Sequence, residues 1–149
     1  MPTPPVIEEI DFGSEGYRTV LDFRDRILRQ PLGMRLSETD TEGEEVQRHF
    51  VLRQDGEILA GVIAVARKRG TVQLRQMWVR DDTAGRGLGR SLLEGVERIL
   101  AAEGLDLLTL HARVVVRGFY ERCGYTPEGE EFEEIGLPHI VMSRRIGNG

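Results

Sequence analysis

Apolar residues recur along the chain with two different periods, which separate predicted helices from predicted strands. A helical period runs through residues 16–30, where Pro31 ends it, and again through residues 88–100. A shorter helix is expected from about 115 to 123, with Gly124 as its stop. The chain therefore contains at least three predicted helices, two of them with a clear apolar face.

Strand-like patterns lie between these helices. A short strand is expected at residues 6–10. Two longer strands, 49–54 and 57–66, flank the Asp-Gly dipeptide at 55–56, which is a strong signal for a two-residue hairpin. A further strand covers residues 71–79. Three antiparallel strands are therefore expected in the middle of the chain.

The next strand, residues 107–112, is almost continuously apolar, as in a strand whose two faces are both covered. The predicted order of strand 71–79, a helix and strand 107–112 is a crossover unit, which is nearly always right-handed and joins parallel neighbours. Ligands of such sheets bind beyond the carboxyl ends of the strands. A ligand is thus expected next to the segment that follows residue 79.

Length and composition restrict the class of protein. With 149 residues the chain can bury one self-sufficient core, so a single domain, 1–149, is expected. No apolar run approaches the ~20 residues of a membrane span and no leader opens the chain, which predicts a cytoplasmic protein without membrane contact. The single cysteine, Cys123, excludes an internal disulfide and a cysteine-rich metal site. A net charge of -5 disfavours nucleic-acid binding and favours a cationic partner such as an amine.

A glycine-rich turn follows the strand at 71–79 and leads directly into the helix. Its residues are Gly85, Arg86, Gly87, Leu88, Gly89, Arg90 and Ser91. Backbone N–H groups of such a turn and of the first helical turn converge on one point, which favours an anion, most plausibly a phosphate. The third glycine of a dinucleotide fingerprint would fall on Arg90, and no Gly-Lys-Ser/Thr closes a Walker A loop. Nucleotide binding is therefore disfavoured.

The run Ala84-Gly85-Arg86-Gly87-Leu88-Gly89 resembles the pyrophosphate-binding motif Q/R-x-x-G-x-G/A of the GNAT superfamily of acetyl-CoA-dependent N-acetyltransferases, with Ala84 in place of the usual Gln or Arg. Residues 117–125, with Phe119-Tyr120-Glu121 leading into Gly124-Tyr125, are similar to the second signature of this superfamily. Residues 129–142 resemble the closing hairpin of a bacterial branch. Together the resemblance covers residues 74–145.

The resemblance implies an α/β three-layer fold, with a mixed, mostly antiparallel, splayed sheet and helices on both faces. It also implies transfer of an acetyl group from acetyl-CoA to a primary amine by direct attack in a ternary complex, without a metal. The acceptor would be a small molecule or a peptide, and a homodimer is reasonable. The implied cofactor-binding residues are Met77, Trp78 and Val79 along the pantetheine, and Gly85, Arg86, Gly87, Leu88, Gly89, Arg90 and Ser91 around the pyrophosphate.

The resemblance also assigns one catalytic residue, because Tyr120 takes the place of the tyrosine that donates a proton or hydrogen bond to the departing thiolate. The general base stays open. A lysine-type amine has a pKa of about 10.4 and must lose its proton before it attacks. Where family members often place a glutamate the chain has Arg75, which cannot act as a base. The remaining candidates are Glu130, Glu131, Glu133, Glu134, His111 and His139.

Two further expectations complete the interpretation. Residues 31–49 form a polar linker with a second short helix reaching His49, and the resemblance places the wall of the acceptor pocket there. The departures at Arg75 and Ala84 motivate an alternative, a non-catalytic module that binds acyl-CoA. Trp78 is expected to pack in the core, and Cys123 to be structural and not a nucleophile.

Overall fold

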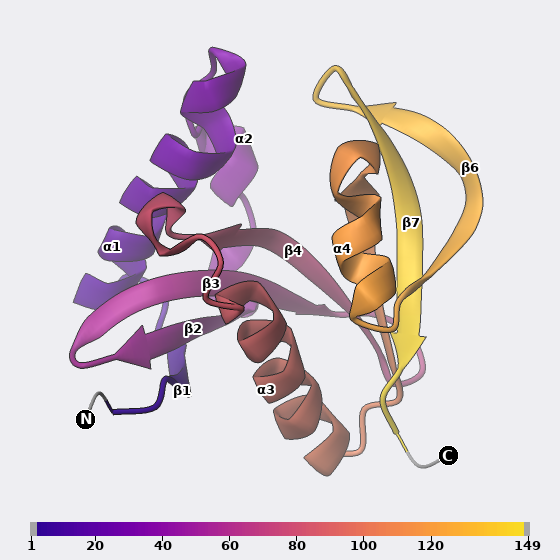
Figure 1. Ribbon diagram of the computed structural model, residues 1–149, viewed down its shortest axis with the longest axis horizontal. Coiled ribbons are helices and arrows are strands. Elements are labelled where there is room, and N and C mark those ends of the chain that lie inside the picture. Colours follow the sequence, from indigo (N-terminus) through magenta and orange to yellow (C-terminus); the bar gives the residue numbers. More distant parts are fainter. Residues whose placement is uncertain (1–2, 148–149) are drawn as a thin grey trace. The chain divides into compact units, whose positions relative to one another are not determined.

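The computed structural model describes residues 3–147, which hold one mixed sheet with the strand order β1-β2-β3-β4-β5-β7-β6 (Figure 1). No helix in this part of the chain is long and apolar enough to cross a membrane. The strands are β1 (Val6–Ile10), β2 (Arg48–Gln54), β3 (Glu57–Ala66), β4 (Thr71–Val79), β5 (Leu107–Arg113), β6 (Thr126–Glu134) and β7 (Leu137–Arg145). The α-helices are α1 (Glu15–Arg24), α2 (Glu38–Thr41), α3 (Leu88–Ala102) and α4 (Arg117–Arg122).

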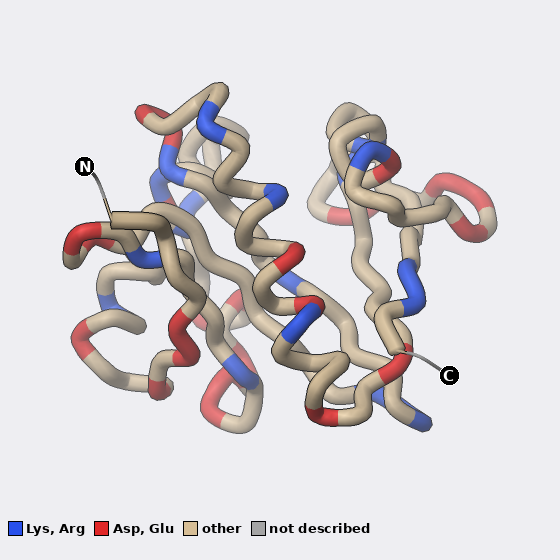
Figure 2. The backbone as a smooth tube through the Cα atoms, turned by 60° about the horizontal axis from the view of Figure 1, so that its bottom comes forward, with Lys and Arg blue, Asp and Glu red and all other residues tan. Residues whose placement is uncertain are grey.

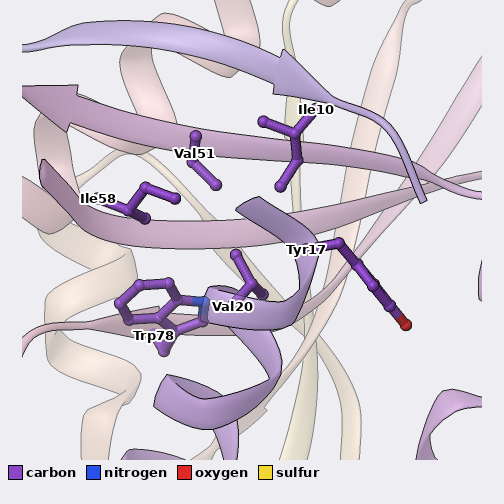
Figure 3. Packing of buried hydrophobic residues seen from close by; sticks show 6 residues of the cluster. All are labelled: Ile10, Tyr17, Val20, Val51, Ile58 and Trp78. Carbon is purple, nitrogen blue, oxygen red and sulfur yellow. The ribbon is translucent and has the colours of Figure 1, made fainter. Parts of the chain in front are cut away.

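The chain divides into two compact units, and the first contains the described residues up to Ala64 together with Gln76–Val96. Its strands β1, β2 and β3 are joined in antiparallel pairs. A buried cluster forms the core of this unit and is shown in Figure 3: Ile10, Tyr17, Val20, Val51, Ile58 and Trp78. Trp78 stacks on Phe23 of α1 with ring centroids 4.8 Å apart, so α1 is fixed to the end of β4.

The second unit contains Val65–Arg75 and the described residues from Glu97 onward. Here β5 pairs in parallel with the first residues of β4, and β7 pairs antiparallel with both β5 and β6. The predicted parallel pairing around the crossover helix is thereby confirmed. Tyr125, which follows α4 in the chain, is buried in this unit, and its hydroxyl donates to the buried Glu97 carboxylate at 2.8 Å.

Most predicted elements are confirmed, and the differences have local causes. The first helix is α-helical only to Arg24 and continues as a π-helical turn, Asp25–Arg29. The short helix α2 does not reach His49, which lies in β2. Ser37 starts α2 with a capping box, and Gly43 in the left-handed conformation follows its end. The helix predicted from 115 begins at Arg117, after a 3-10 turn of three valines.

Candidate functional site

The glycine-rich turn of the first unit has the geometry that its sequence predicts. Gly85 and Gly87 have φ angles of 83° and 70°, in the left-handed region that favours glycine. A Cβ atom built on either glycine would meet no atom of residues 3–147 within 4 Å. Both residues are exposed, and α3 begins one residue after Gly87. The turn therefore presents bare backbone to an open space at a helix N-terminus.

Hydrogen bonds within the turn and in the residues before it hold it in shape. The buried Thr83 donates its hydroxyl to the carbonyl of Arg80 at 2.6 Å, and the N–H of Arg86 donates to the carbonyl of Thr83 at 3.3 Å. The Arg80 guanidinium forms two hydrogen bonds with Asp82, at 2.8 and 2.7 Å, which raise the pKa of Arg80. The bond from the Ser91 N–H to the Gly87 carbonyl, 3.1 Å long, closes the first turn of α3. The N–H groups of Leu88, Gly89 and Arg90 precede the first intrahelical bonds of α3 and are available to an anion.

Two arginines flank this anion-binding turn. Arg86 donates through a guanidinium nitrogen to the side chain of Gln54, and Arg90 donates to Glu94 at 2.9 Å, one helical turn further on. Both arginines are exposed. The contacts are local and surface-accessible, so that a phosphate could replace either partner at little cost.

The end of β4 precedes this turn in the sequence, and its backbone departs from regular strand geometry at one residue. Gln76 has a φ angle of 53°, unusual for a residue with a side chain. It directly precedes the residues assigned to the pantetheine, Met77, Trp78 and Val79. The side-chain carbonyl of Gln76 accepts a hydrogen bond of 3.2 Å from Nε of Arg24. The kink in β4 is therefore tied to α1.

Arg24 belongs to a buried polar network that the sequence did not reveal. Both guanidinium Nη atoms donate to the carboxylate of Glu44 at 2.8 Å, and neither side chain is exposed. The Tyr17 hydroxyl donates to the same carboxylate at 2.6 Å, and the Glu44 carbonyl lies 2.9 Å from Nε2 of His49. Burial alone would raise the pKa of Glu44, but hydrogen bonds from Arg24 and Tyr17 and the charge of Arg24 lower it. The linker before β2 is thereby fixed to α1.

One signal for this network was present in the sequence. Arg24 lies four residues after Val20, on the apolar stripe of the first helix, and a charge on a buried helical face needs a partner. Which of the acidic residues of the linker would supply it could not be read from spacing, since Glu44 is 20 positions away.

Tyr120 lies on α4 in the second unit, packed against the rings of Phe119 and Tyr125 at 5.1 and 6.0 Å. Burial, followed by the charge of Cys123, raises the pKa of Tyr120 to about 12. The phenol is therefore neutral at physiological pH. Full proton transfer from such a phenol to a thiolate with a pKa near 8.5 costs about 5 kcal/mol. Tyr120 is thus better suited to donate a hydrogen bond than to give up its proton.

Of the six candidate bases, the structure brings three together. Nδ1 of His111 lies 2.9 Å from one oxygen of Glu134, and Nε2 of His139 lies 3.6 Å from the other. Glu130 is exposed. Glu131 and Glu133 line a hollow of about 230 Å³ together with Phe132 and Pro138. These acidic residues of β6 are among the red segments in Figure 2.

Two other residues in the C-terminal half, Cys123 and Arg113, have buried side-chain atoms. Cys123 is buried at the end of α4, as a structural residue would be. Arg113 ends β5, and its Nε atom is buried without a hydrogen-bond partner among the described residues.

Comparisons with known proteins show which family and which solved structures the chain resembles. Residues 11–146 match the family described as Acetyltransferase (GNAT) domain. The chain is similar to YyaT, an uncharacterized protein of Bacillus subtilis (strain 168), with 29% identity over 109 residues, which are 73% of this chain and 72% of YyaT. An acyl-CoA N-acyltransferase from Pseudomonas aeruginosa has a similar structure, with a TM-score of 0.78, 21% identity and coverage of 94% of this chain and 99% of that one.

A second solved structure is an aminoglycoside 6'-N-acetyltransferase complexed with coenzyme A. It matches with a TM-score of 0.73 and 17% identity, over 95% of this chain and 97% of that chain. At these identities the structural similarities show a shared fold, and they confirm the predicted α/β fold with a mixed sheet.

Proposed function

The chain belongs to the GNAT acetyltransferase family, and we propose that it transfers an acetyl group from acetyl-CoA to a primary amine by direct attack within a ternary complex. Acyl transfer from an acyl-CoA to an amine is the activity of the family. The choice of acetyl-CoA, the primary amine and the ternary complex are the parts that we propose for this chain. We also take residues 1–149 as one such domain and expect it in the cytoplasm, as a homodimer.

The observation that carries the proposal is the turn at Gly85 and Gly87. Its left-handed glycines, its open surroundings and the free N–H groups of α3 suit the pyrophosphate of CoA. Exposed Arg86 and Arg90 would add positive charge by exchanging Gln54 and Glu94 for phosphate oxygens. Ala84 supplies no polar side chain where the family motif has Gln or Arg, so that the backbone would carry most of the binding.

Residues of β4 and α4 would carry out the acetyl transfer. The pantetheine would lie along the backbone of Met77, Trp78 and Val79 like an added strand, and an N–H of this segment would polarise the thioester carbonyl. The amine nitrogen forms a bond to the carbonyl carbon while the carbon–sulfur bond breaks. Tyr120 would donate a hydrogen bond to the departing thiolate, in accordance with its raised pKa of about 12.

Calorimetric titration tests the cofactor assignment. The purified protein is titrated with acetyl-CoA, CoA, ATP and NADH, and we expect selective micromolar binding of the two CoA species. Gly87→Val is the matched variant: the surrounding space is open, so that the valine acts through the strained backbone and by covering the N–H groups. Binding should weaken at least tenfold. Equal binding by Gly87→Val would overturn the assignment of the turn.

A thiol-release assay with a panel of amines then tests turnover. Acetylated product identified by mass spectrometry supports the enzyme, whereas tight binding of acetyl-CoA without transfer to any amine favours the non-catalytic alternative, which the departures at Ala84 and Arg75 suggest. Loss of both binding and transfer would refute the family-based proposal for this chain as a whole.

A further inference from the structure

Three titratable side chains meet on the second unit, each from a different strand. His111 lies on β5, Glu134 at the end of β6 and His139 on β7. The Glu134 carboxylate lies between the two imidazoles, 2.9 Å from Nδ1 of His111 and 3.6 Å from Nε2 of His139. Phe132 packs edge-on against His111, with ring centroids 5.2 Å apart. The orientation of the His111 ring is therefore fixed from two sides.

The partner of Nδ1 determines which nitrogen of His111 is basic. An ionised carboxylate only accepts hydrogen bonds, so the tautomer of His111 that suits the 2.9 Å contact with Glu134 carries its proton on Nδ1 and donates a hydrogen bond from it. In the neutral ring the lone pair then lies on Nε2, on the opposite side of the ring. The second nitrogen of His111 is thus prepared to accept a proton, and the resulting imidazolium would be stabilised by Glu134.

His139 is placed differently and does not compete for this role. Its side chain is only 5% exposed, against 37% for His111. Its Nδ1 donates to the carbonyl of Leu137 at 2.8 Å, and its Nε2 faces Glu134. His139 is therefore the buried member of the cluster, and His111 is the accessible one.

Access to His111 follows from the alternation of β5. Leu108, Leu110 and Ala112 are buried with at most 4% exposure, so His111 points to the opposite face of the strand. Phe132 belongs both to the contacts of His111 and to the hollow of about 230 Å³ next to Glu131 and Glu133. An ammonium group in this hollow would meet two carboxylates and an aromatic ring, which attract cations.

We propose that His111 is the general base that deprotonates the acceptor amine, and that Glu134 is the residue that positions it. The proposal rests on the proposed acetyl transfer. Nε2 of His111 takes one proton from the ammonium group, and the neutral amine attacks the thioester carbon. The carbon–nitrogen bond forms as the carbon–sulfur bond breaks, the second proton of the nitrogen goes to the CoA sulfur, and His111 returns its proton to water.

The charged groups around His111 define what a pH profile would report. Glu134 and His139 contact the cluster directly, and Glu131 and Glu133 lie at the neighbouring hollow. Arg113 follows two residues later on β5. Glu128, also on β6, accepts a 2.5 Å hydrogen bond from Ser143 instead of a histidine, so it provides a matched control carboxylate.

The experiment compares His111→Ala, Glu134→Gln and Glu128→Gln with the wild type in acetyl transfer to spermidine, L-lysine and an alanine-initiated peptide. We expect His111→Ala to lose roughly 10²-fold or more in kcat, with partial rescue by added imidazole. Glu134→Gln should lower kcat less and alter the pH profile of kcat, because the imidazolium formed during the reaction loses its counter-charge. Glu128→Gln should match the wild type.

Binding of acetyl-CoA, measured by calorimetry on every variant, separates the possible failures. A His111→Ala variant that turns over like the wild type overturns the inference and leaves the proposed function standing. A loss that imidazole does not rescue, together with an unmoved pH profile in Glu134→Gln, also overturns it, since a structural role would suffice. A wild type that acetylates none of the three amines overturns the proposed function and the inference with it.

Discussion

Removal of the Arg24 guanidinium should destabilise the protein strongly, because it would leave the carboxylate of Glu44 buried without a counter-charge. Arg24 makes two 2.8 Å hydrogen bonds to Glu44 and one of 3.2 Å to Gln76, and the side chains of the ion pair are 0% exposed. Breaking a buried pair from one side costs about 3–5 kcal/mol. Since small domains are stable by only about 5–15 kcal/mol, Arg24→Met should lose a large part of that stability.

The pH dependence of this loss identifies its cause. In the wild type the pKa of Glu44 is lowered, because Arg24 and Tyr17 overcome the opposing effect of burial. A group with a lowered folded pKa contributes stability above its unfolded pKa, near 4.3, and this contribution is lost as the pH falls through the folded value. In Arg24→Met, burial would dominate and raise the pKa of Glu44, so the carboxyl group takes up a proton at mildly acid pH. The difference between the two proteins should therefore shrink from pH 8 towards pH 4.

Urea denaturation from pH 8 to pH 4, followed by circular dichroism, measures this difference. Arg117→Met is the control, because its 3.5 Å pair with Glu121 is 38% and 44% exposed and should contribute at most about 1 kcal/mol. The double variant Arg24→Met/Glu44→Leu should recover most of the loss, since no unpaired charge remains. A loss below 1 kcal/mol in Arg24→Met, or a loss of 3–5 kcal/mol that does not change with pH, would refute the assignment of the cost to an uncompensated charge.

Three shorter predictions concern packing and catalysis. Gly61→Ala should cost about 1–3 kcal/mol in urea denaturation, because the new Cβ would lie 2.6 Å from Nε1 of the buried Trp78. Gly16→Ala, the same change in α1 with its closest contact at 3.5 Å, should instead stabilise by up to about 1 kcal/mol, and equal effects of the two variants would contradict the packing argument. Tyr120→Phe should lower kcat by roughly 10–10²-fold through the loss of one hydrogen bond to a charged group, with calorimetric binding of acetyl-CoA unchanged; weakened binding would assign Tyr120 to the cofactor site instead.

The parts of the molecule that the sequence predicted are those that depend on the backbone. Glycines at 85 and 87 are needed for their φ angles, and periodic apolar residues define β3, β4 and α3, so local rules suffice. The buried network could not be predicted in this way, because Arg24 and Glu44 meet only through the fold. The same holds for His111 and Glu134, which are 23 positions apart and come together through the pairing of β5, β7 and β6.

The network around Arg24 connects a part of the molecule that the sequence predicted, the end of β4, with a part that it did not predict, the linker before β2. The kink at Gln76 precedes the strand segment that would lie along the pantetheine, and its side chain is held by the same arginine that holds Glu44 in the linker. The sequence gives that linker no motif, and the wall of the acceptor pocket is placed there only as an expectation from the family resemblance. A change in the linker that moves Glu44 would therefore release Arg24 and, through it, Gln76. In this family member, acceptor choice and thioester alignment would then share one buried ion pair.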